Sequence, residues 1–545
     1  MFQFPSSNLF LIILLFIFPL LILFFKRTKS EGPYPKLPPG PWKLPFVGNL
    51  HQLAGSSLPH RCLRDLSNKY GPVMTLHFGQ ILTVVVSSPQ AAREVFQAQE
   101  LIFAQRPVTL GMEAMSFEHP GGLMASPYGE YWKQMRKISV VELLTAKRVM
   151  SFRSVREDEA WTLVESIMSC SCDGKRPVNL SQMIISTAIA TVSRAVYGKK
   201  SRGHDEFIMS LKELLTLSTG FTVPDCFPSI KCLGYVTGIK PGLERVKQKL
   251  SKILDDVIRD HEIKVQKAST RNNIDETLEE DLVDVLLRLQ QSSELKFPIT
   301  TNHIKTVVMD IVGAGGETTA TALEWAISEL VRNPRTLEKA QTEVREVLGG
   351  QKRKIEENDI DQKLVYLKCV IKETLRLHPP APLLGREARE RCIILGYDIP
   401  YKTKIVINAW ELGRDPEVWG PMPIAFSQRG SLVPPLISKG PTLSFFHLGL
   451  EGEFVLEYHF PCQTWNWYLL TCCTILIGIS QMVQKWQNLT CLRLTKSAVG
   501  GGMICTWLPL LLYLFPGDNR IEIVKIVICN ISFNSLVNQD LKTIQ

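Results

Sequence analysis

The segment Thr306–Leu330 constrains the fold of this chain more than any other feature. Its residue pattern fits one long helix, and apolar side chains surround that helix almost completely. A helix that is hydrophobic all round lies inside a protein, because no face of it favours water. The segment therefore needs cover from other elements, which indicates a large helical domain.

The middle of this helix reads Ala314-Gly315-Gly316-Glu317-Thr318-Thr319. Two glycines weaken a helix by roughly 1 kcal/mol each relative to alanine, so some other requirement must keep the backbone open there. A flat cofactor or a bound oxygen molecule against the helix is one such requirement, and Glu317 with Thr318 could then relay protons. A packing kink with a solvated glutamate explains the same residues equally well.

The rest of the body, from residue 59 to about residue 389, is dominated by helical patterns with short β-like runs. The sequence therefore predicts a mainly α fold with a minor β-sheet. The clearest predicted helices are Asp281–Gln290 and Leu323–Leu348, and the clearest strands are Val73–His77 and Ile81–Val86.

The N-terminus predicts a membrane anchor. Leu9–Phe25 is an uninterrupted apolar run at the lower length limit for a spanning helix, and basic residues at 26, 27 and 29 follow it. A cleaved signal peptide is the alternative, but no small-residue cleavage site follows. Residues 1–25 are thus expected to anchor the chain, and the proline-rich residues 26–50 to form a stiff spacer.

Charge and cysteine content narrow the class of protein. The formal charge of +9 is spread along the chain without the basic runs of a nucleic-acid groove. Thirteen cysteines without a regular spacing suit a reducing compartment better than a secreted, disulfide-linked protein. The domain that follows the anchor is therefore expected to face the cytosol.

The composition changes at Pro421. Only 14 of the 124 residues after it are charged, against 101 of the first 421, and this tail holds 6 of the 13 cysteines. The tail also lacks sustained helical or alternating periodicity. We interpret residues 51–421 as the main folded domain and residues 422–545 as an aberrant, poorly ordered tail.

Several motifs in order resemble the cytochrome P-450 family, and in particular its membrane-anchored plant members. Each motif alone is weak, since an i,i+3 pair such as Glu373 with Arg376 is most often a surface feature. The series is specific: Leu37-Pro38-Pro39-Gly40-Pro41, Trp132 with Arg136, the Ala314–Thr319 motif, Glu373 with Arg376, Arg386-Glu387-Ala388, Ile399-Pro400, Asn408-Ala409-Trp410 and Gly413-Arg414-Asp415-Pro416.

The resemblance implies a haem b cofactor, with dioxygen and with electrons from an NADPH-dependent cytochrome P-450 reductase. The haem-facing residues would be Trp132, Arg136 and Arg386 at the propionates, with Ala314 and Gly315 at the oxygen-binding stretch. Glu317 and Thr318 would be catalytic, delivering protons to dioxygen. Glu373 and Arg376 would be structural.

The family's iron-binding loop is missing. The family pattern Phe-x-x-Gly-x-Arg-x-Cys-x-Gly, whose cysteine thiolate binds iron, occurs nowhere in this chain, and neither does its Pro-Glu-Arg-Phe segment. No protein ligand to iron is therefore expected. Synonymous codons for Phe446–Phe460, read one base out of frame, can spell the missing loop, so we interpret the tail as the product of a shifted reading frame.

Two functions remain open from the sequence. The first is a monooxygenase that hydroxylates a hydrophobic plant specialised metabolite, for which Leu383-Leu384 and Val308–Val312 would suit the ligand. The second is a catalytically inactive, membrane-anchored remnant, because the haem-ligating cysteine is absent. Either protein is expected at the endoplasmic reticulum membrane, with the domain facing the cytosol and with no nucleic-acid partner.

Overall fold

The computed structural model describes residues 36–54, 58–117, 121–170, 178–198, 203–218, 222–270, 280–292, 295–348 and 364–420. The predicted anchor, the first part of the predicted spacer and the tail 422–545, including Phe446–Phe460, lie outside these residues. Within them the fold is mainly helical with two small sheets, as predicted.

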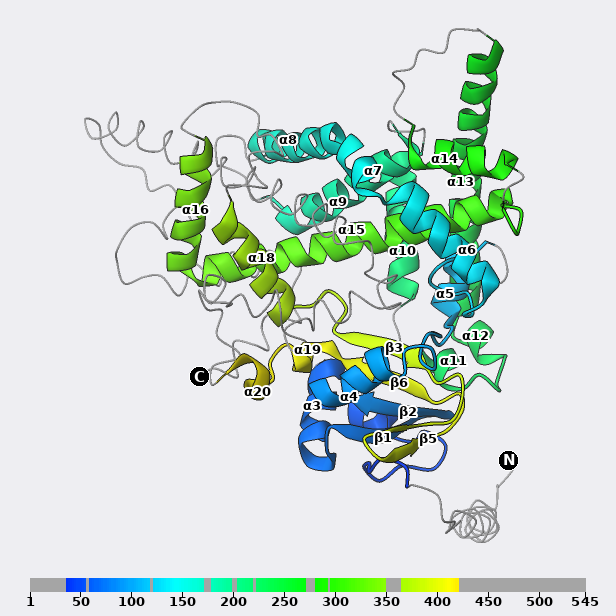
Figure 1. Cartoon of the computed structure of the whole chain (residues 1–545), viewed down its shortest axis with the longest axis vertical. Helices are drawn as coiled ribbons and strands as arrows, with labels where there is room; N and C mark the ends of the chain where they lie inside the picture. The colour runs from blue at the N-terminus through cyan, green and yellow to red at the C-terminus, as the bar shows by residue number, and fades with distance from the viewer. Residues whose placement is uncertain are drawn as a thin grey trace, which may run out of the picture.

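One long helix, α15 (Thr301–Arg332), runs through the middle of the helical part and confirms the helix predicted over Thr306–Leu330 (Figure 1). A capping box begins it: the Thr300 hydroxyl accepts from the His303 N–H at 3.2 Å, and the His303 side chain bonds back to the Thr300 N–H. Most of its residues are buried, from Ile304 and Val308 to Leu330. The apolar character of the helix thus serves burial on several sides.

The described helices that pack against α15 and supply that cover include α5 (Leu110–Met115), α9 (Leu180–Tyr197), α13 (Ile239–Thr270), α14 (Leu282–Gln291), α16 (Pro334–Leu348) and α18 (Val365–Leu377). The approach of α9 is close enough to require glycine, because a Cβ on Gly316 would lie 2.8 Å from Cγ1 of Ile189. At Gly316 the glycine therefore serves the close packing of α9 against α15.

The predicted helix Leu323–Leu348 is wrong as a single element. Helix α15 ends at Arg332, Asn333 leaves the helical conformation with φ −120° and ψ 77°, and α16 (Pro334–Leu348) begins at once. Proline disfavours the α conformation in the residue before it, so Pro334 breaks the pattern. The predicted helix Asp281–Gln290 is confirmed as α14, which runs from Leu282 to Gln291. Asp281 is its N-cap, and the Asp281 side chain accepts from the Asp284 N–H.

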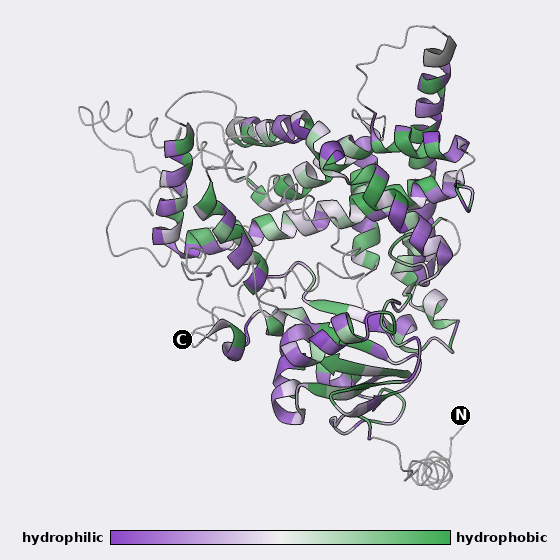
Figure 2. Ribbon diagram, viewed as in Figure 1, coloured by the Kyte–Doolittle hydropathy of each residue, from purple (hydrophilic) through white to green (hydrophobic). Residues whose placement is uncertain are grey.

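The main sheet joins early and late parts of the chain. Its order is β1 (Val73–Phe78), β2 (Ile81–Val86), β6 (Lys404–Asn408), β3 (Leu383–Glu387), and β6 runs parallel to β2 but antiparallel to β3. The first two strands confirm the predicted ones. The strands are largely hydrophobic, whereas the helix beside them, α3, carries many hydrophilic residues (Figure 2).

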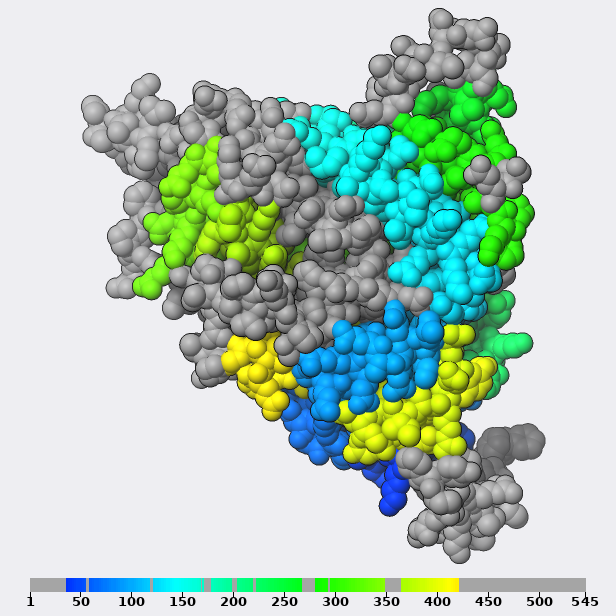
Figure 3. Space-filling view, viewed as in Figure 1, coloured from blue at the N-terminus to red at the C-terminus, as the bar shows by residue number. Residues whose placement is uncertain are grey.

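The space-filling view shows the same joining of distant segments at the surface. Residues near position 100 lie between patches formed by residues 383–420 (Figure 3). Strands β4 (Cys392–Ile394) and β5 (Tyr397–Ile399) form a separate antiparallel pair. In the residues that the structure describes, the remaining helices are α2 (Leu50–Ala54), α3 (Pro59–Tyr70), α4 (Pro89–Arg93), the π-helices η1 (Glu94–Ala98) and η2 (Ser139–Leu143), α6 (Glu130–Ile138), α7 (Ala146–Ser151), α8 (Arg153–Cys170), α10 (His204–Leu217), α11 (Val223–Cys226), α12 (Leu233–Val236), α19 (Ala409–Leu412) and α20 (Pro416–Trp419).

The described part of the proline-rich segment, residues 36–50, lies against the sheet. The Thr75 N–H donates to the Pro39 carbonyl at 2.8 Å, and a Cβ on Gly40 would lie 2.0 Å from the Thr75 carbonyl oxygen. Gly40 is thus fixed by close backbone approach. Across the part of the chain that the structure covers, no helix is both long and apolar enough to cross a bilayer.

Candidate functional site

A pocket lies between segments that are far apart in the sequence. It is a partly open recess with little free volume between its side chains. Two of the predicted haem-facing residues, Trp132 and Arg386, meet in it. The full lining is Val95, Phe96, Glu100, Phe103, Ala104, Arg106, Leu123, Met124, Ser126, Trp132 and Arg386.

Trp132 is presented to this pocket by α6. The indole is 6% exposed, and its Nε1 donates to the Leu123 carbonyl at 3.2 Å. The Arg136 guanidinium lies over the ring, 5.5 Å from its centre. Since indole has a single N–H donor, Trp132 in this conformation positions a loop and leaves carboxylate binding to other residues.

Two arginines give the pocket its positive charge. Arg386 lies on β3, is 4% exposed, and donates from Nη1 to the Gly385 carbonyl at 2.8 Å. Arg106 lines the same pocket and was not predicted. Its position follows from a bridge between distant residues, in which the Glu387 N–H donates to the Gln105 carbonyl at 2.8 Å. No local pattern around Arg106 reveals this contact.

The predicted catalytic residues share the least buried face of α15. Glu317 is exposed, and Ala314 and Thr318 are half-buried. The Thr318 hydroxyl donates to the Ala314 carbonyl at 2.5 Å, and that of Thr319 to the Gly315 carbonyl at 2.6 Å. Partial desolvation raises the pKa of Glu317 above its ordinary value, which favours a carboxyl able to hold and release a proton.

Glu373 and Arg376 form a buried pair and not a surface one. The guanidinium donates to both carboxylate oxygens, at 2.6 and 2.8 Å, and the side chains are 11% and 6% exposed. Arg376 also donates to the Gly413 carbonyl at 2.6 Å and lies 4.9 Å from the centre of the Trp419 ring. The pair thus ties α18 to the turn that follows α19.

The charged side chains of the pocket suit the carboxylates of a haem. Arg106 and Arg386 offer charged donors of the kind that bind carboxylates, such as those of haem propionates. The described cysteines lie on other elements and none lines this pocket: Cys62, Cys170, Cys226, Cys232, Cys369 and Cys392. Within the described residues, the structure therefore offers a carboxylate cradle but no thiolate beside it.

The sequence predicted two apolar segments as ligand contacts, Val308–Val312 and Leu383-Leu384, and the structure places them differently. Val308 and Val312 are 1% and 0% exposed and belong to the helical core, so they contact protein. Leu383 and Leu384 on β3 are half-buried. Only the second pair remains suited to a ligand.

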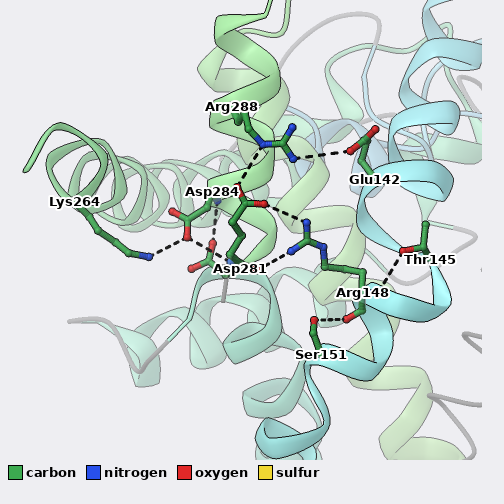
Figure 4. Close-up of polar contacts among 9 residues, drawn as sticks. Glu142, Thr145, Arg148, Ser151, Lys264, Asp281, Asp284 and Arg288 are labelled. Carbon is green, nitrogen blue, oxygen red and sulfur yellow. Dashed lines mark hydrogen bonds and ion pairs between the residues drawn. The ribbon is translucent and has the colours of Figure 1, made fainter. Parts of the chain in front are cut away.

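A second polar cluster lies between α13 and α14, at His261, Asp281 and Asp284. Figure 4 shows its two carboxylates, Asp281 and Asp284, with Lys264 beside them. His261 contacts the Val257 carbonyl through Nδ1 at 2.7 Å and the Asp281 carboxylate through Nε2 at 2.8 Å. Lys264 lies 2.9 Å from the Asp284 carboxylate. Lys264 already pairs with Asp284 and His261 already bonds to Asp281, so we interpret the cluster as a clamp between helices.

Comparison with known proteins gives one consistent result. A family model for cytochrome P-450 matches residues 38–429. A melianol synthase of Azadirachta indica is 50% identical over 418 residues, covering 77% of this chain and 80% of the relative. A cytochrome P-450 of Panax ginseng is 47% identical (76% and 80% covered), and a germacrene A hydroxylase of Barnadesia spinosa 45% identical (73% and 77% covered).

Proposed function

Because the chain belongs to the cytochrome P-450 family of oxidoreductases, it is a monooxygenase of specialised metabolism, and we propose that it hydroxylates a hydrophobic terpenoid-like molecule. The names of the relatives support this substrate class, since melianol synthases and a germacrene A hydroxylase are among them. The half-buried Leu383 and Leu384 offer apolar contacts for such a ligand.

The cationic pocket is the observation that carries the proposal. Arg106 and Arg386 would hold the carboxylates of a haem, which when bound supplies oxygen activation. Glu317 would move a proton along the open face of α15, and its raised pKa suits that task. Glu373 and Arg376 would hold α18 against the Gly413 turn.

Membrane location and electron supply belong to the same proposal. The apolar run Leu9–Phe25, followed by basic residues, supports a single anchor in the endoplasmic reticulum with the domain in the cytosol. An NADPH-dependent reductase on that membrane would supply electrons. Fractionation of cells that express the full chain tests this: recovery in the carbonate-soluble fraction would contradict an anchor.

The reduced carbon-monoxide difference spectrum of the full chain tests the function. A thiolate-haem band is expected from an active enzyme. Its absence would favour the alternative, an inactive anchored remnant, which the comparisons do not support. Expression of a second chain, with the reading frame restored after Pro421, then decides whether the tail alone accounts for the loss.

A variant pair tests the cradle separately. Arg386→Ala should reduce the haem retained after purification, because Arg386 is buried at the pocket. Arg389→Ala is the matched control, since Arg389 lies three residues further on and donates to the Leu101 carbonyl outside the pocket. The comparison is made in the chain, as written or with its reading frame restored, that retains haem, and equal haem content in the two variants would then contradict the proposed cradle.

A further inference from the structure

A buried acid on α15 lies directly beneath the loop that walls the pocket. Asp310 is 5% exposed, and its Oδ2 accepts from the Leu123 N–H at 2.7 Å. The Met124 N–H is a second backbone donor to the same carboxyl group. Both donors belong to residues that line the pocket. Asp310 lies outside the motifs, quoted above, that carry the family resemblance.

The loop is shaped to receive this carboxylate. A Cβ on Gly122 would lie 2.1 Å from Asp310 Oδ2 and 2.6 Å from Cγ2 of Thr306, so only glycine allows the approach. Gly121 has φ +105°, a conformation that other residues rarely adopt. The two glycines therefore serve one contact with α15.

Thr306 lies one turn before Asp310 on α15 and bonds to Phe117, in the segment that precedes this loop. The Thr306 hydroxyl accepts from the Phe117 N–H at 2.9 Å and donates to the Asn302 carbonyl at 2.8 Å. Thr306 and Asp310 lie four residues apart and thus share one face of the helix. Two anchors on one rigid helix fix where the loop lies.

The contact extends from the loop to Trp132. Leu123 donates its N–H to Asp310, and its carbonyl accepts from the Trp132 indole at 3.2 Å. One peptide segment thus links a buried carboxylate to the aromatic wall of the pocket. A shift of Leu123 would move both the pocket lining and the indole.

We propose that Asp310 is a positioning residue, whose carboxylate fixes the backbone of Gly122–Met124 and, through Leu123, the indole of Trp132 at the pocket. The backbone contact stands independently of any catalysis. A role of Asp310 in substrate selection rests on the proposed function, because the loop that Asp310 fixes forms part of the wall that a bound molecule would meet.

Hydrogen–deuterium exchange of the full chain, with residue-level fragmentation at about pH 8, tests the proposal. Asp310→Asn keeps the size of the side chain but removes the charge and turns an amide N–H₂ toward backbone donors. The Leu123 and Met124 amides should exchange at least about tenfold faster in this variant, the scale expected for loss of a charge-assisted bond. Exchange in α14 should stay unchanged.

Two controls separate a local effect from a general one. Glu324→Gln removes another partly buried carboxyl of α15, whose pKa burial also raises, and should leave the loop amides protected. Gly122→Ala should reproduce the loss while Asp310 is retained, whereas Gly129→Ala, with no atom within 4 Å of its added Cβ, should not. Unchanged loop protection in Asp310→Asn, or equal loss in Glu324→Gln, overturns the proposal.

The wild-type chain decides the question if the Asp310 variant does not fold. The Leu123 amide should then be protected well above that of Ala125, and equal exchange of the two overturns the proposal. None of these measurements needs haem, so the carbon-monoxide spectrum and the exchange data can fail independently.

Discussion

Replacing Arg376 with methionine should destabilise the domain far more than its position in an i,i+3 pair suggests. The change removes two donors at 2.6 and 2.8 Å from Glu373, whose side chain is 11% exposed, and leaves the Gly413 carbonyl without its donor at 2.6 Å. Removing one partner of a buried pair costs about 3–5 kcal/mol, because the other charge stays buried. We therefore expect a loss of that size in unfolding free energy.

The chain contains a matched exposed pair. Glu130 and Lys133 are also three apart on a helix, at 3.1 Å, but their side chains are 57% and 50% exposed. Lys133→Met removes the same charge and keeps an aliphatic stem, so its effect should fall within experimental error. The Glu373→Gln, Arg376→Met double variant should recover part of the loss, because no uncompensated charge then remains.

Urea unfolding followed by circular dichroism measures these differences, with hydrogen exchange of the α18 amides as a local readout. The second measurement is needed because a chain of this length need not unfold in one step. A loss below about 1 kcal/mol for Arg376→Met, or a loss equal to that of Lys133→Met, would refute the reasoning, since the buried pair would then behave as a surface pair.

Three further outcomes follow from the packing and charge of the helical part. Gly316→Val should cost about 1–3 kcal/mol of unfolding free energy, because its side chain meets Ile189 closer than contact distance, and Ile189→Ala should restore part of that loss in urea titrations. Burial disfavours the charged form of His261, but the hydrogen bond and the charge of Asp281 outweigh burial and raise the pKa of His261 above 6.5. The stabilisation by His261 is therefore present below pH 6.5 and lost as the pH rises through the raised pKa. If the urea midpoint of His261→Gln falls as steeply as that of the wild type over this range, the expectation is contradicted. Burial raises the pKa of Asp310 from 3.8 to about 7. Between these pH values the folded state keeps a proton that the unfolded state releases, so the free energy of unfolding falls as the pH rises. Asp310→Asn should remove this pH dependence in urea titrations, and an unchanged slope would contradict the expectation.

The sequence predicted the elements better than their contacts. The burial of α15 followed from its apolar surface, and β1 and β2 followed from β-branched runs. The break at Asn333 was missed because the periodic pattern continues across Pro334. The reason for Gly316 could not be read locally, since it depends on how closely α9 approaches.

The site shows the same division. Trp132 and Arg386 were predicted from motif order, and the pocket brings them together. Arg106 and Asp310 were missed because nothing in their own segments marks them: the first depends on a bridge to β3, and the second on a loop that passes over α15. Contacts between distant segments carry no local signature.

The parallel pairing of β2 with β6 has a consequence for synthesis on the ribosome. Strand β2 emerges more than three hundred residues before the strand that pairs with its open side. Until Lys404–Asn408 has been made, the apolar edge Ile81–Val86 remains available to other nascent chains or to a chaperone. A messenger cut short between these two points should therefore yield aggregates, and not a smaller folded domain.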